Sequence, residues 1–335
     1  GSAPTKVNDG VRIDCKTATG YLDSGLQNRT TYYYRAFPYN SKKQVQTIQA
    51  NAVVSAMPMD GIALYSLPVG TLVVDPNTRY YNVPIIWKIA DINHSGYPAN
   101  SVTLITERII TFKCFDAKEP DNRETNRRQY GNSRYSVSNI AQWLNSEYFN
   151  WYSPQHSTDT PPSVLLVGEN PYDTQPGFLS TFSYAFRSAL MDTTMTSSTI
   201  LAVDGISAET ITFKMFLVAI EELGHGSGLD VGEGSRITLF ASSESSVAYA
   251  TQQAIDNTDD AYKPSVADTC WWLSRTRDCL KGNIPAYASS ISPSGRLSHT
   301  GCYRGNHGIR PLCNLSSSTF VYPSPNAQGQ YELLF

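Results

Sequence analysis

The chain has 335 residues, enough for one large domain or two ordinary ones, and it can bury a core without disulfide staples. Only 16% of the residues are charged and the formal net charge is -3, so the composition implies no basic face for nucleic acid. The longest apolar run, residues 215–220, is much too short to span a bilayer. These features exclude nucleic-acid binding and membrane insertion as expected functions.

Residues 1–58 predict a small all-β module that serves as a spacer. Leu26 is followed by Tyr32 at the spacing of a tyrosine corner, in which the tyrosine hydroxyl bonds to the backbone upstream of its strand. Period-2 alternation places Tyr32 and Tyr34 toward the core and Tyr33 outside. The stretch resembles the second half of a fibronectin type III module, although a whole sandwich needs about 100 residues. We therefore expect a partial module that ends near residue 58.

The region from residue 59 is expected to begin with strands at 70–75 and 85–91 around a turn at Pro76-Asn77, followed by a strand pair or bent strand over 102–115. A polar loop comes next. Its carboxylates Asp116, Glu119 and Asp121 are spaced as in a calcium loop, but the glycine and terminal glutamate of an EF-hand are missing. A surface loop is the favoured interpretation, and calcium binding stays open.

Two amphipathic helices are expected to flank the β core. Residues 136–148 begin with a serine cap, and their apolar side chains recur at helical spacing. Residues 178–191 place aromatic side chains on one face, which usually indicates core packing. A polar, proline-bearing insert over 150–176 joins the two helices. The remaining expected elements are strands at 199–203 and 211–218 and a short helix at 245–255.

The segment from Cys270 to Leu315 organises the rest of the region. It opens with CWWLSR and closes with NHGIRPLCNL. Because neighbouring strand residues point to opposite faces, one of Trp271 and Trp272 is expected in a core. Between the two ends lie rings and forked donors of the kind that recognition surfaces favour, although each alone is more often an ordinary loop residue. The predicted ligand face consists of Trp272, Arg275, Tyr287, Arg296, His299, Tyr303, Arg304 and Asn306.

WWLSR at 271–275 with GIRPLCNL at 308–315 resembles the C-terminal signature of a domain family of unassigned function. That family is common in tail proteins of phages and prophages of Gram-positive bacteria and in surface proteins of gut bacteria, and its usual forms are WWLR and G-F/V/I-R-P. Ser274 stands where the family usually has arginine and Arg275 follows it, so which side chain takes the arginine's place stays open. Further matching stretches over roughly residues 60–323 are WKIAD at 87–91, TLIT at 103–106, YGNSRYSVSNIAQWLNS at 130–146 and GFL at 177–179.

This family in turn resembles the C-type-lectin-like fold. The resemblance implies an α+β domain over residues 59–335, with two flanking helices and a looped β core. It further implies a phage or phage-like tail protein, located in the virion tail or alternatively on a bacterial surface. The head is then expected to bind a host cell-surface polysaccharide or protein. Other tail subunits are additional implied partners, and homotrimers are common among tail fibres.

The six cysteines predict no metal-thiolate site, because the chain has no C-x-x-C motif and no histidine at zinc-ligand spacing. We expect no metal and no cofactor. Phage tails are assembled in the bacterial cytoplasm, so reduced, buried cysteines are the default interpretation. A disulfide between Cys270 and Cys279, or between Cys302 and Cys313, is the alternative.

Catalytic motifs are weak in this sequence, and we expect a non-enzymatic binding module. The Gly-Ser-Gly turn at 226–228 lacks the strand–elbow–helix context of a serine hydrolase. Neighbouring carboxylates such as Glu221 and Glu222, or Glu169 and Asp173, do not by themselves give the separations that glycosidases use. The alternatives are a wall- or glycan-cleaving enzyme, a protein like the formylglycine-generating enzymes, and a structural tail or baseplate decoration.

Overall fold

The computed structural model describes residues 60–164, 168–264, 269–282 and 284–335, together with residues 25–27, 30–38, 53–56 and a few isolated positions nearer the N-terminus. The chain divides into two compact units, residues 1–62 and 63–335. Residues 57–59, which carry most of the expected joint, and Cys15 lie outside the described residues.

The first unit contains a short antiparallel pair, β1 (Tyr32–Tyr34) with β2 (Val54–Ala56). The backbone N–H of Gln27 donates a hydrogen bond of 2.9 Å to the Tyr32 hydroxyl, which confirms the predicted tyrosine-corner bond. Tyr33 is exposed while Tyr32 and Tyr34 are half-buried, so the predicted alternation is confirmed within β1. It is wrong beyond β1, where Ala36, expected in the core, is exposed, and Arg35 and Phe37, expected outside, are half-buried.

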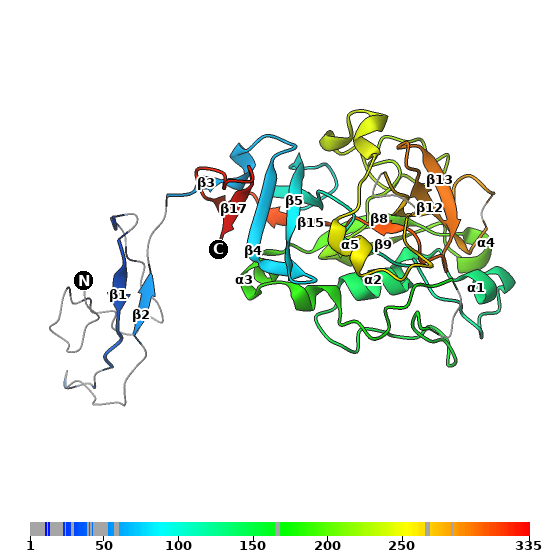
Figure 1. Ribbon diagram of the computed structural model, residues 1–335, viewed down its shortest axis with the longest axis horizontal. Helices are drawn as coiled ribbons and strands as arrows, with labels where there is room; N and C mark the ends of the chain where they lie inside the picture. The colour runs from blue at the N-terminus through cyan, green and yellow to red at the C-terminus, as the bar shows by residue number, and fades with distance from the viewer. Residues whose placement is uncertain are drawn as a thin grey trace. The chain divides into compact units, whose positions relative to one another are not determined.

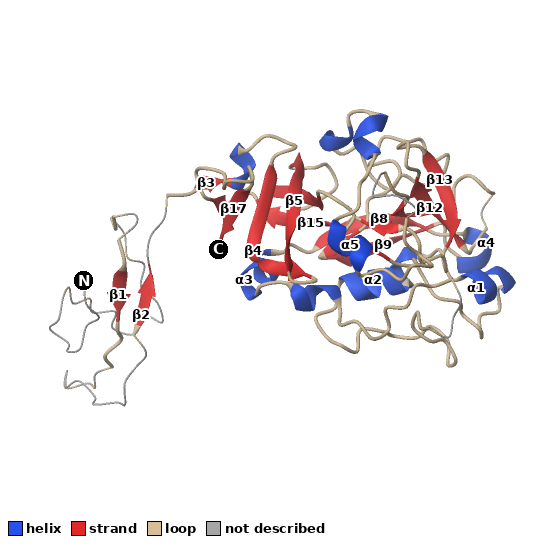
Figure 2. Cartoon of the chain, in the orientation of Figure 1, coloured by secondary structure: helices blue, strands red, loops and turns tan. Residues whose placement is uncertain are grey.

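The second unit is mainly β, and the prediction of an α+β, C-type-lectin-like domain with two flanking helices is wrong (Figure 2). Strands make up 29% and helices 15% of the described residues, and the five α-helices among them are short. No helix in that part of the chain is long and apolar enough to cross a membrane. The helices are α1 (Thr125–Tyr130), α2 (Asn139–Leu144), α3 (Tyr184–Ala189), α4 (Leu201–Asp204) and α5 (Gln252–Asp256).

The first predicted helix is shortened at both ends by side-chain hydrogen bonds. A 3-10 turn occupies residues 135–137, and the cap of α2 is Ser138, whose hydroxyl accepts from the Ala141 N–H. At the C-terminal end the Asn145 amide donates to the Met215 carbonyl over 2.8 Å, which ties the chain to β10 (Met215–Phe216). Tyr148, expected on the buried face, is 71% exposed.

The second predicted helix is broken in the middle. Residues 178–181 form a 3-10 turn, and α3 starts only after Ser183, whose hydroxyl accepts from the Phe186 N–H. The same hydroxyl donates to the Asp75 carboxylate over 2.6 Å. A tertiary contact therefore fixes the break, although the aromatic side chains Phe178, Phe182 and Phe186 are buried as expected.

The larger of the two main sheets has eight strands in the order β10-β15-β6-β5-β4-β17-β16-β3 and curves into a half-barrel. The expected hairpin is present, but its turn lies at Tyr81 and Asn82, both in the left-handed region (φ 48° and 63°), instead of at Pro76-Asn77. β17 and β4 are parallel. The bounds are β3 (Ile62–Ala63), β4 (Leu72–Tyr80), β5 (Val83–Ile92), β6 (Ser101–Thr106), β15 (Leu312–Ser316), β16 (Phe320–Val321) and β17 (Tyr331–Leu334).

The second sheet has five strands in the order β13-β12-β11-β14-β7, at the end of the unit remote from β4 (Figure 1). β11 and β14 are parallel, with Trp272 opposite Gly308, so the double-tryptophan and glycine-arginine-proline strands are neighbours as predicted. The bounds are β7 (Thr111–Phe112), β11 (Trp272–Arg277), β12 (Tyr287–Ile291), β13 (Leu297–Gly301) and β14 (Gly308–Ile309).

A separate hairpin joins β8 (Thr193–Ser198) to β9 (Ala208–Phe213), with α4 between the two strands. The strand expected at 199–203 is therefore wrong. The strand expected at 211–218 is present in two pieces, as the end of β9 and as β10.

Two short connections join the main sheets directly, from β6 to β7 and from β14 to β15. Arg310 fixes the place where these two segments meet, because its guanidinium donates to the Thr106 carbonyl (3.3 and 3.2 Å) and lies 5.0 Å from the ring centre of Trp272. A Cβ at Gly308 would come within 2.5 Å of the Ile109 side chain. The tryptophan and GIRP motifs are thus joined in one structural contact.

Candidate functional site

The residues of the predicted ligand face divide into buried and accessible groups. Trp272 and Arg275 are fully buried and pack in the core, so they do not face solvent. The accessible residues are the half-buried Tyr287, His299 and Tyr303 and the exposed Arg296, Arg304 and Asn306.

The accessible residues lie at two ends of the β12–β13 hairpin. The ring centres of Tyr287 and His299 are 5.7 Å apart, and Tyr287 is opposite Gly301, the last residue of β13. Tyr303 and Arg304 follow directly after that end. Arg296 lies in the turn at the other end of the hairpin and is not brought to them.

Tyr303 is the centre of an aromatic and cationic surface that we call the Tyr303 patch, formed by Lys118, Tyr130, Tyr303 and Arg304. The Lys118 ammonium lies 5.3 Å and the Arg304 guanidinium 5.6 Å from the Tyr303 ring centre, both within cation–π range. The Tyr130 ring centre is 5.6 Å away. Lys118 and Tyr130 were missed by the sequence reasoning, because they belong to the distant loop between β7 and α2.

Two glycines hold the Tyr303 ring in place. A Cβ at Gly168 would lie 2.9 Å from one edge of the ring, and a Cβ at Gly301 would lie 3.0 Å from the opposite edge. Gly168 also has a φ of +98°, which side-chain-bearing residues rarely adopt. The ring is therefore fixed before any ligand arrives, which reduces the entropy lost on binding.

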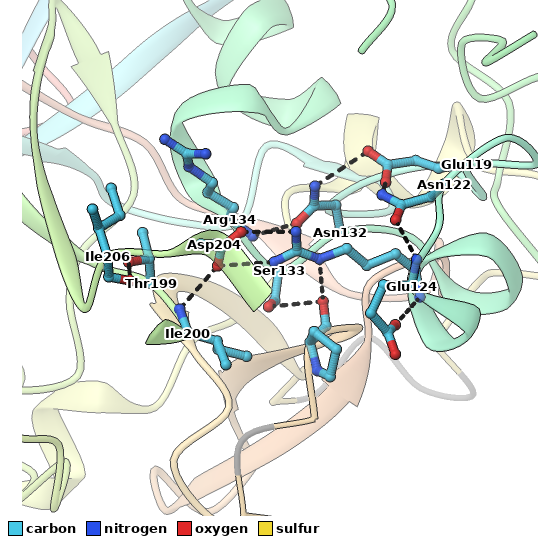
Figure 3. Close-up of polar contacts among 12 residues, drawn as sticks. Glu119, Asn122, Glu124, Asn132, Ser133, Arg134, Thr199, Ile200, Asp204 and Ile206 are labelled. Carbon is cyan, nitrogen blue, oxygen red and sulfur yellow. Dashed lines mark hydrogen bonds and ion pairs between the residues drawn. The ribbon is translucent and has the colours of Figure 1, made fainter. Parts of the chain in front are cut away.

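The loop that carries Lys118 and Tyr130 is anchored by polar contacts (Figure 3). Arg127 in α1 forms an ion pair of 2.8 Å with Asp204 in α4, and both side chains are buried. Glu124 caps α1 by accepting from the Arg127 N–H over 2.9 Å. The Asn132 amide donates to Glu119 over 3.2 Å. The loop is thus a fixed part of the fold, whereas the sequence predicted a plain surface loop.

The same loop contributes to a small polar cavity of about 10 Å³, whose lining includes Asp116, Glu119, Tyr152 and Asp159. Asp116 is satisfied, because it accepts from the backbone N–H groups of Asn132 and Asn139. We call Asp116, Glu119, Asp159 and Glu169 the acidic cluster. Burial, and then the charges of all four of these carboxylates, raise the pKa of the Tyr152 hydroxyl.

Asp116, Glu119 and Glu169 of the acidic cluster lie in an environment that opposes their ionisation. Burial raises the pKa of Glu169 to about 8 and is also the main cause that raises the pKa of Asp116 and of Glu119. Asp159 Oδ1 and Glu169 Oε2 are buried, and no described residue donates a hydrogen bond to either atom. Asp159 and Glu169 come from the insert at 150–176, so no local spacing could reveal the cluster.

Glu119, His156 and Asp159 each offer one ligand atom within 4.8 Å of the other two. The calcium spacing considered in the sequence is not what the structure assembles, because Asp121 is exposed and accepts a hydrogen bond from Ser157. The residues that could hold a cation are shared between the loop and the insert.

A second group of buried carboxylates is neutralised by Arg275. Its guanidinium binds Glu222 through two contacts of 2.6 and 2.7 Å, and both side chains have no exposed surface. Tyr97 donates to the same carboxylate over 2.6 Å. Arg275 therefore fills the charged role in the WWLSR motif, whereas Ser274 donates to the Ser289 carbonyl.

Glu221, one of the carboxylates considered for catalysis, is also held by hydrogen bonds. Glu221 accepts from the Ser227 hydroxyl and from the Glu233 N–H. Ser227 thus points its hydroxyl at a carboxylate, and the Gly-Ser-Gly turn is held in place. Cys114, Cys279, Cys302 and Cys313 are free thiols, so neither of the two alternative disulfides is present.

A wider, more apolar groove of about 260 Å³ lies between β5 and α5. Arg108 and Glu107 contribute charge to its lining, and the Arg108 guanidinium lies 5.9 Å from the ring centre of the exposed Tyr249. This arginine–tyrosine pair resembles the one in the Tyr303 patch but has no second cation at the ring among the described contacts.

A family model, described as a domain of unknown function (DUF6273), matches residues 100–317, well over half of the chain. The chain belongs to the DUF6273 family. No curated protein and no solved structure gives a significant match.

The DUF6273 region contains the whole Tyr303 patch, the acidic cluster and the Arg275–Glu222 pair. The strands β4, β5, β16 and β17 lie outside the matched residues, although they complete the same eight-stranded sheet. The candidate sites are therefore features of the family region itself.

Proposed function

We propose that the second unit is a non-enzymatic binding module that recognises a negatively charged polymer on the surface of a Gram-positive host cell. The proposal places it in a phage or phage-like tail protein. The tail setting rests on the sequence resemblance of the WWLSR and GIRPLCNL motifs. The chemistry of the ligand rests on one observation, the half-buried Tyr303 ring with an ammonium and a guanidinium both within about 6 Å of its centre.

An anionic sugar or polyol-phosphate chain suits this arrangement. Lys118 and Arg304 supply the donors that pair with phosphate or carboxylate, and arginine does so with a planar fork. The Tyr303 ring offers an apolar face for the ring or carbon chain between the charges. Single contacts of this kind are weak, but many copies on one particle multiply the affinity.

Binding of the fluorescently labelled protein to a panel of Gram-positive bacteria, and to purified teichoic acid against a neutral glucan, tests the proposal. The double variant Tyr303→Ala/Arg304→Ala is expected to lose about tenfold or more in affinity. The matched control is Tyr249→Ala/Arg108→Ala, which removes a similar exposed pair elsewhere. Binding should also weaken as salt rises, because exposed charges are screened.

Unchanged binding by the Tyr303 and Arg304 variant, with loss by the control, would move the ligand face to the groove beside α5. Release of soluble fragments from host walls would instead support an enzyme. A stable complex with a tail subunit and no affinity for cells would support a structural decoration.

A further inference from the structure

Glu119, His156 and Asp159 come from two segments that are far apart in the sequence, and Glu119 and Asp159 line the same small cavity. Glu119 lies in the loop before α1, and the other two lie in the insert at 150–176. Their ligand atoms all lie within 4.8 Å of one another, which is the spacing of groups around one ion. The cavity of about 10 Å³ next to Glu119 and Asp159 has room for one particle of the size of a water molecule.

An independent observation shows that this cluster is incomplete. Asp159 is 9% exposed, and its Oδ2 accepts hydrogen bonds from the backbone N–H and from Nδ1 of His156. Its Oδ1 is buried, and no described residue is its partner. A buried carboxylate oxygen without a donor costs free energy comparable to a lost charged hydrogen bond, so a ligand at this position would be strongly favoured.

We infer that Glu119, His156 and Asp159 bind a divalent metal ion that joins the insert to the loop before α1. Two carboxylates supply two negative charges, which a divalent cation balances. The imidazole favours the borderline metal Zn²⁺ over Ca²⁺, which takes oxygen ligands. Mn²⁺ suits the two carboxylates and water, and is the second ion to be tested. With three protein ligands, the remaining coordination positions are left to water.

The site is open to solvent on one side, and a neighbouring amide orients one of its carboxylates. His156 has a side chain that is 33% exposed, so the ion can enter from solvent on that side. Asn132 donates to Glu119 Oε1 and thereby orients the carboxylate. The insert also carries Gly168, against which Tyr303 packs, so an ion that fixes the insert would support the Tyr303 patch from behind. The inference itself does not depend on the proposed function.

The test uses the full chain after removal of metals with a chelator. Calorimetric titration with Zn²⁺ and with Mn²⁺, followed by elemental analysis, should show one tightly held ion per chain. The melting temperature should rise by several degrees on addition of the ion, since only the folded state has the site. Chymotrypsin digestion of the chelated protein should show faster cleavage within residues 150–176, which contain Tyr152 and Tyr172.

Asp159→Asn and Glu119→Gln are each expected to lower the affinity for the ion by about 100-fold or more. Asp121→Asn is the matched control, because Asp121 lies in the same loop but is exposed and outside the cluster. Equal affinity in Asp159→Asn and in the unaltered protein would overturn the inference, as would the absence of a stoichiometric ion in the unaltered protein. The measurements on the unaltered protein hold even where a variant fails to fold.

Ca²⁺ binding that is tighter than Zn²⁺ and Mn²⁺ binding, and unaffected by His156→Ala, would overturn the assignment of His156 as a ligand. Failure of this site would leave the Tyr303 patch testable, because the cell-binding variants alter neither Glu119 nor Asp159.

Discussion

The buried carboxylates of this unit differ in the partners that the chain gives them. Glu222 lies against Arg275, whose guanidinium makes two short contacts to it and further bonds to backbone carbonyls. In the acidic cluster, by contrast, the ion-pair partner of Asp159 is the imidazole of His156, and one oxygen of Asp159 has no partner among the described residues. Both oxygens of the Glu222 carboxylate are satisfied by the chain itself, whereas Asp159 Oδ1 leaves a place for a ligand from outside.

The largest effect on stability is expected from removing Arg275, the positive charge that pairs with Glu222. Arg275→Met leaves Glu222 buried without its partner and should lower the free energy of unfolding by about 3–5 kcal/mol. Urea unfolding measures the change. The double variant Arg275→Met/Glu222→Gln should recover part of the loss, and Arg296→Met, at an exposed arginine, should change stability by less than about 0.5 kcal/mol. An unchanged free energy of unfolding in Arg275→Met would mean that Glu222 needs its partner no more than Asp159 does.

Lys113 offers the opposite case to the buried carboxylates, because it is a buried cation with no carboxylate partner among the described residues. Its ammonium lies 4.5 and 4.4 Å from the ring centres of Trp143 and Tyr172 and donates to Gln175, and burial lowers its pKa to about 7. The folded state then binds fewer protons than the unfolded state between pH 7 and 10.5, so this group makes stability rise with pH in that window.

Lys113→Met should therefore remove a pH dependence. The stability of the unaltered protein relative to the variant is expected to increase by up to about 4 kcal/mol from pH 7 to 10.5, and to stay constant below pH 7. Urea unfolding at a series of pH values gives the difference. A difference that does not vary with pH would show that the ammonium is not destabilised by burial.

The smallest effect is expected from neutralising one carboxylate in each group. This change in side-chain charge should alter the stability in opposite directions at Asp159 and at Glu222. In chelator at pH 7, Asp159→Asn removes one charge from a crowded cluster and should stabilise the protein by about 1 kcal/mol. Glu222→Gln removes a charge that Arg275 needs and should destabilise it. Thermal unfolding of the two variants measures both changes. A loss of stability in both variants would contradict the difference between the two carboxylate environments.

The sequence predicted the strands better than the helices or the site. Alternating apolar residues predicted the β4–β5 hairpin, but its turn was placed at Pro76-Asn77 because proline and asparagine favour turns, whereas the chain turns at Tyr81 and Asn82. The helix expected over 178–191 failed because Ser183 has a tertiary partner in Asp75, and periodicity carries no information about such contacts. This is why a helix-flanked fold was expected and a mainly β fold is found.

The candidate site was predicted only in part. Tyr303 and Arg304 could be named because they follow a recognisable motif, whereas Lys118 and Glu119 become neighbours of Tyr303 and Asp159 only through the fold. Trp272 and Arg275 were named for their chemistry, but strand alternation and a charged partner in Glu222 place both in the core. Residue type therefore indicated recognition chemistry, and long-range contacts decided which residues reach solvent.

The two short connections between the main sheets bear on how the unit unfolds. β6 continues directly into β7, β14 continues directly into β15, and Arg310 binds the two connecting segments together at Thr106. We expect the two sheets to unfold in one cooperative step, because separating either sheet disturbs segments that the other sheet shares.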